Sequence, residues 1–112
     1  MIDRSELEAK LAVIKCAYVA ELPARAASLR AAWGRVQTED WAQEPLQELH
    51  RLAHSLAGSG ATFGFVEVSA HARALEIPLK ALLQDASADR SALPDRLAAL
   101  TAALTAASKS GA

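Results

Sequence analysis

Apolar side chains recur at spacings of three and four residues along most of this chain, which is the period of a helix buried on one face. The first series begins at Leu7 and continues to Val36. Pro23 lies within it. Because proline removes a backbone donor and clashes with the preceding turn, we expect either a kink near Leu22 or two consecutive helices. The polar residues 37–40 end this element.

Two further helices are predicted from the same period. One should start between Asp40 and Pro45, because aspartate is a good N-cap and proline is tolerated in a first turn, and it should reach about Gly60. The next spans residues 66–83, and Pro78 should bend or split it. Both are expected to bury a single apolar stripe.

A last helix follows a polar turn over residues 85–91 and carries leucines at positions 93, 97, 100 and 104. We expect residues 107–112 to form a frayed tail. Amphipathic helices with short connections bury their stripes most simply side by side. The sequence therefore predicts an all-α fold, an antiparallel four-helix bundle with an N-terminal helical extension, in a single domain over residues 1–112.

Composition narrows the possible partners. The net charge is -1 with interspersed signs, which gives no general attraction to nucleic acid or to anionic membranes. The first residues lack a secretory leader, and no stretch approaches the roughly 20 apolar residues of a membrane span, so we expect a cytoplasmic protein. Cys16 is a lone cysteine and is assigned no role. No long apolar run demands a partner subunit, and we expect a monomer.

The segment around His54 carries the candidate chemistry. The stripe of its helix consists of Leu46, Leu49, Leu52, Ala53 and Leu56. At about 100° per residue, His54 points well away from this stripe and should face solvent, whereas His50 lies nearer its edge. The helical neighbours of His54 are Ala57, Gly58 and Ala61, which leave a bare patch. Gly58 indicates either close approach by a partner or the beginning of helix termination.

An exposed, unprotonated imidazole offers a nitrogen lone pair to an electrophile. Phosphoryl transfer asks little covalent chemistry of its acceptor, so one histidine outside any pocket would suffice. The run from His54 to Ser59, with Phe63-Gly64 and the later Leu75-Glu76, resembles the signature of histidine-containing phosphotransfer (HPt) domains. The resemblance is strong over residues 49–76 and weaker over the rest of the chain.

This resemblance implies that His54 is the phosphorylated residue and that Gly58 leaves room beside it. One position departs from the family pattern, because Ala57 stands where a lysine or arginine is usual. Arg51 could supply the missing charge from the preceding turn, and Gln47 could add a hydrogen bond. The residues expected to contact the phosphoryl group or a partner are Gln47, His50, Arg51, Ser55, Ala57, Gly58 and Ala61.

The resemblance also implies partners and a role. The chain would be a stoichiometric phosphoryl carrier and not an enzyme. It would accept the phosphoryl group from the aspartyl-phosphate of a response-regulator receiver domain and pass it to another receiver. The two-component pathway would begin with a sensor histidine kinase, either simple or hybrid. It needs no cofactor of its own, and Mg²⁺ is expected on the receiver.

Three alternatives were weighed. His50 and His54 could share a metal with His71, but no cysteine pair or carboxylate supports such a site, and we predict none. The glycines after residue 57 fit neither a dinucleotide fingerprint nor a phosphate loop, so the chain should not bind ATP. The remaining alternative is a helical docking or dimerisation module whose exposed histidine has no chemistry.

Overall fold

The computed structural model describes residues 3–110, which form four helices joined by short connections. α1 spans Arg4–Thr38, α2 Gln43–Thr62, α3 Val66–Gln84 and α4 Leu93–Ser110. The described part of the chain contains no strand. The predicted all-α fold is confirmed.

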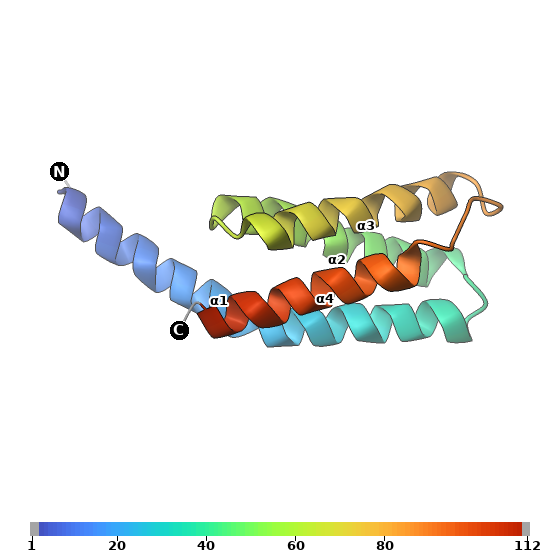
Figure 1. The fold of residues 1–112 in the computed structure, drawn as a ribbon, viewed down its shortest axis with the longest axis horizontal. Coiled ribbons are helices and arrows are strands. Elements are labelled where there is room, and N and C mark those ends of the chain that lie inside the picture. The colour runs from blue at the N-terminus through green and yellow to red at the C-terminus, as the bar shows by residue number, and fades with distance from the viewer. Residues whose placement is uncertain (1–2, 111–112) are drawn as a thin grey trace.

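α1 is much longer than the other helices. Asp3 begins it as the N-cap, with its carboxylate accepting a hydrogen bond of 2.9 Å from the backbone N–H of Glu6. The helix runs through Pro23 without a break, but its axis changes direction there, and the first turns project beyond the rest of the molecule (Figure 1). Of the two predicted outcomes the kink is therefore observed, and the N-terminal extension is the first part of α1.

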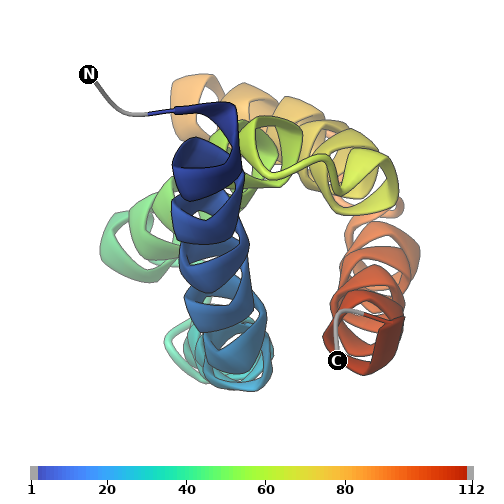
Figure 2. The ribbon, with the colours of Figure 1, turned by 90° about the vertical axis from the view of Figure 1, so that its left-hand side faces the viewer.

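The four helices pack as a ring of neighbours. α1 lies beside α2 and α4, and α3 lies beside the same two helices, whereas the backbones of the diagonal pairs do not come within 8 Å of each other among the described residues. Figure 2 looks at the bundle from the end where α1 emerges, with α1 in front and α4 to its right. The core is aliphatic. Its largest fully buried side chains are Leu22, Leu29, Leu49, Leu56, Leu75, Leu79, Leu93, Leu100 and Leu104.

The pairing of α2 with α3 depends on Gly60. A Cβ atom at this position would lie 3.0 Å from the backbone nitrogen of Ser69, so only glycine allows α3 to come this close. Next to it, the Ser69 hydroxyl donates a 2.8 Å hydrogen bond to the backbone carbonyl of Ala57. The turn between the helices passes through Gly64, whose φ of +81° is a left-handed conformation that favours glycine. These contacts set the register of α3 along α2.

One sequence expectation is corrected. Residues 107–110 are not a frayed tail, because α4 continues to Ser110 and Ala107 is buried against the core; residues 111 and 112 lie outside the described residues. Of the two outcomes expected at Pro78, a split is not observed, because α3 is helical through Gln84 with Pro78 on its buried side. Among residues 3–110, no helix has the length and apolar character needed to cross a bilayer.

Candidate functional site

His54 lies on the outer face of α2, with 76% of its side chain exposed. Its neighbours Ala53 and Leu56 are buried in the core, so the rigid packing of the helix holds the imidazole outward. The predicted exposure of this ring is therefore observed. This exposure leaves the ring accessible to another macromolecule.

Glu76 of α3 approaches the ring from across the groove between α2 and α3. Its Oε1 atom lies 3.2 Å from Nδ1 of His54, and the side chain of Glu76 is only 21% exposed. Oε1 itself is screened from solvent and makes no hydrogen bond of good geometry to any residue between 3 and 110. A screened carboxylate oxygen strongly favours a proton donor, and the nearest candidate is the N–H of the imidazole.

The second histidine of α2 stacks on the first. The rings of His50 and His54 are nearly parallel, with an interplanar angle of 9° and centroids 6.2 Å apart. His50 is half-buried, in keeping with its predicted place at the edge of the apolar stripe. The two imidazoles are thus not equivalent, because His54 is the more exposed and has the carboxylate partner.

Arg51 is already engaged with a carboxylate. Its Nη2 and Nε atoms lie 2.5 and 3.0 Å from the two carboxylate oxygens of Glu48. These hydrogen bonds, with the attraction between the charges, raise the pKa of Arg51 and lower the pKa of Glu48. Gln47 is exposed in a shallow hollow beside this pair. An Arg51 that is neutralised in this way has less charge to offer to a phosphoryl group on His54.

The small residues beside His54 fall into two groups. Ser55, Gly58 and Ala61 are exposed, and a Cβ atom at Gly58 would meet nothing within 4 Å. Gly58 is also inside α2 and not at its end, so neither internal packing nor helix termination requires glycine there. Ala57 differs from our expectation of an exposed patch: it is only 5% exposed, because α3 packs over it.

α3 brings two cations that the sequence analysis did not identify. Arg73 and Lys80 are exposed, and they lie three residues before and four residues after Glu76. This spacing places all three on one flank of α3, the flank that faces His54. Glu76 itself was noticed only as part of the family pattern. The register of two helices was needed to bring these residues to the histidine.

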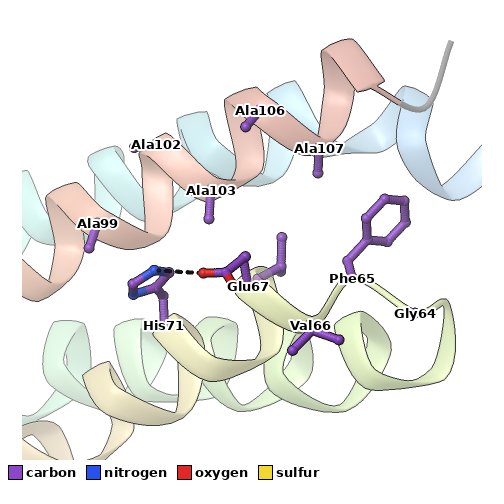
Figure 3. A pocket seen from close by; sticks show the side chains of 11 residues that line it. Gly64, Phe65, Val66, Glu67, His71, Ala99, Ala102, Ala103, Ala106 and Ala107 are labelled. Atoms are coloured by element: carbon purple, nitrogen blue, oxygen red, sulfur yellow. Dashed lines mark ion pairs between the residues drawn. The ribbon is translucent and has the colours of Figure 1, made fainter.

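The described surface also has a hollow away from His54. It has a volume of about 640 Å³, lies between the start of α3 and the end of α4, and is lined by alanines on the α4 side. His71 lies in it with its Nε2 atom 3.6 Å from Glu67 (Figure 3). None of the residues around His54 lines this hollow. Across residues 3–110, no three His, Cys, Asp or Glu side chains gather as a metal site would require.

Comparison with known proteins supplies a family. The family model described as Hpt domain matches residues 14–110, which is most of the chain and includes His54, Glu76 and the other residues of the candidate site. Searches of curated proteins and of solved structures gave no match.

Proposed function

Because this chain belongs to the Hpt domain family, whose role is histidine phosphotransfer in phosphorelays, we propose that His54 is its phosphoacceptor. The observation that supports this most directly is the pairing of an exposed imidazole with a screened carboxylate, at 3.2 Å between Nδ1 of His54 and Oε1 of Glu76. The family match gives the class of chemistry. His71 also has a carboxylate neighbour, Glu67, but that side chain is 81% exposed, and the screened carboxylate beside His54 supports the choice of His54.

The carboxylate determines which nitrogen reacts. Glu76 favours the tautomer with the proton on Nδ1, because the carboxylate charge lies 3.2 Å from that nitrogen and a small turn of the ring would point the N–H to Oε1. The lone pair is left on Nε2, at the part of the ring that Glu76 does not contact. We propose Nε2 as the nucleophile.

The transfer step balances as a displacement at phosphorus. Nε2 of His54 forms a bond to the phosphorus of a receiver aspartyl-phosphate, and the bond between phosphorus and the aspartyl oxygen breaks. The electron pair of that bond returns to the receiver carboxylate. The imidazole ring gains positive charge as the new bond forms, and Glu76 offsets this charge through Nδ1–H. The reverse displacement passes the group to a second receiver.

Charge on the phosphoryl oxygens needs cations. We expect the receiver to contribute a bound Mg²⁺ during transfer. In the free phosphorylated protein, Lys80 and Arg73 are the candidate cations on α3, because they lie on the flank that carries Glu76, whereas Arg51 is paired with Glu48. One of them would take the role that a basic residue at position 57 has in the family pattern.

The surface near His54 suits a flat protein partner. Gly58 and Ala61 are exposed and small, so a receiver can bring its aspartate close to the ring without displacing side chains. Alignment of the two reacting groups by such docking supplies much of the rate acceleration in a transfer of this kind. The chain then acts as a stoichiometric carrier between receivers.

The test is direct. The protein is incubated with phosphorylated receiver domains, and the product is examined for a phosphoryl group that is labile in acid and stable in alkali. We expect His54→Gln to abolish this signal and His50→Gln to retain it. Labelling that survives in His54→Gln and disappears in His50→Gln would refute the assignment.

A further inference from the structure

The first turns of α1 carry an exposed aliphatic stripe. Leu7, Leu11 and Ile14 are 49%, 54% and 50% exposed, although their spacing of four and three residues is that of a buried helix face. Tyr18 continues the same spacing into the bundle core. The family match begins at residue 14, so most of this stripe precedes the family bundle. The sequence analysis expected a monomer because it found no long exposed apolar run, and this stripe is an exposed apolar surface that it did not identify.

Charged residues flank the stripe unequally. At 100° per residue, Glu8 and Lys15 lie on one side of it, while Lys10 lies on the other side together with Ala17. Residues beside an apolar seam determine which partner helix fits and in which direction. The charges on the two flanks therefore indicate which helix the stripe can bind and in which direction.

We propose that the stripe binds the same stripe of a second copy of this chain, with the two α1 helices antiparallel. In this arrangement each flank of the stripe faces the same flank of the other copy. Glu8 of each copy therefore meets Lys15 of the other, and Lys10 of each copy meets the uncharged Ala17 of the other. A parallel pair would instead bring Lys15 against Lys10, and Glu8 against Asp3. Those are repulsions on both sides, so the charges favour the antiparallel arrangement over the parallel one.

In the single chain, Glu8 and Lys15 make only weak contacts that the dimer would have to replace. Glu8 pairs with Arg4 at 3.3 Å, and both side chains are largely exposed. Lys15 lies over the ring of Phe65 at 5.0 Å, also at the surface. Exposed pairs of this kind contribute little to stability, so exchanging them costs little. An antiparallel pair also places the two bundles at opposite ends, which leaves each His54 open.

The contact between the two α1 stripes is short, which limits the affinity of the dimer. It comprises about two heptads, which is at the low end of the area that specific complexes bury. We therefore expect a reversible dimer with a dissociation constant on the order of 10–100 µM. This association is independent of the proposed phosphotransfer.

Sedimentation equilibrium of the 112-residue chain between about 5 µM and 1 mM tests the proposal. Leu11→Glu should raise the dissociation constant at least about tenfold, because a charge would be buried in the seam. Val13→Glu is the matched control, since Val13 is 70% exposed on the same turn but outside the stripe. It should leave association unchanged. A wild-type protein that is monomeric throughout, or equal effects of the two variants, would overturn the proposal.

Charge variants test the direction of the helices. Lys15→Glu should weaken the antiparallel dimer about threefold to tenfold, and the double variant Glu8→Lys, Lys15→Glu should restore it. In a parallel dimer Lys15→Glu would strengthen association instead, by meeting Lys10. A stripe that binds a receiver domain would give a monomer and a loss of receiver binding in Leu11→Glu. Stronger association in Lys15→Glu, or a monomeric protein that loses receiver binding in Leu11→Glu, would refute the antiparallel dimer. Neither result would affect the assignment of His54 as the phosphoacceptor.

Discussion

Nδ1 of His54 lies 3.2 Å from Oε1 of Glu76, across the groove between α2 and α3. The carboxylate oxygen is screened from solvent, while the imidazole is mostly exposed. The contact thus distinguishes the two ring nitrogens: Nδ1 faces an acceptor, and Nε2 remains for chemistry. The predictions below follow from this pairing and from the residues around it.

Glu76→Gln should slow phosphoryl acceptance about tenfold, in the range typical of residues that orient a reacting histidine. Glutamine keeps the shape of the side chain but cannot offset the positive charge that the ring acquires. The measurements are the transfer rate from a phosphorylated receiver and the tautomer of His54 by nitrogen NMR. Glu67→Gln is the control, because Glu67 is paired with His71, outside the site. An unchanged rate and tautomer in Glu76→Gln would contradict the assigned role.

Lys80→Ala should shorten the lifetime of phosphorylated His54 severalfold, by about threefold or more, because a charge-assisted contact to the phosphoryl oxygens is lost. Arg51→Ala should have a smaller effect, since Glu48 already occupies that guanidinium. Lifetimes are followed by loss of label after the donor is removed. A larger effect for Arg51→Ala than for Lys80→Ala would assign the stabilising cation to α2.

Gly58 and Gly60 should respond in opposite ways to substitution. Gly58→Ala should stabilise the protein by up to about 1 kcal/mol, because alanine favours the helix and its Cβ atom meets nothing within 4 Å. Gly60→Ala should destabilise it by about 1–3 kcal/mol, because its Cβ atom would lie 3.0 Å from the Ser69 backbone nitrogen. Thermal unfolding measures both.

A larger substitution at Gly58 tests the proposed docking surface for the receiver. Gly58→Leu should keep the fold but reduce transfer from a receiver at least about tenfold, because the larger side chain stands where the partner must approach. Its melting temperature and helical content serve as the control for folding. Normal transfer in a folded Gly58→Leu protein would mean that the receiver does not approach over this part of α2.

The spacing of apolar residues in the sequence determined the elements of this fold. The stripe of α2 fixes which side of the helix is buried, and the exposure of His54 follows from it, because helical geometry is local and regular. A disturbance at Pro23 and at Pro78 could also be expected, since proline acts on its own backbone. Whether the helix continues or splits there could not be predicted, because the surrounding packing of the bundle decides whether a helix tolerates a proline.

Only the tertiary structure decided which residues surround His54. Glu76 and Lys80 are more than twenty positions away in sequence, and the close contact at Gly60 sets the register that brings their helix alongside. The same contact buries Ala57, which a view of α2 alone places at the edge of the exposed patch. The buried face of a helix is encoded in its own residues, whereas the neighbours of a side chain depend on how two helices slide and turn against each other.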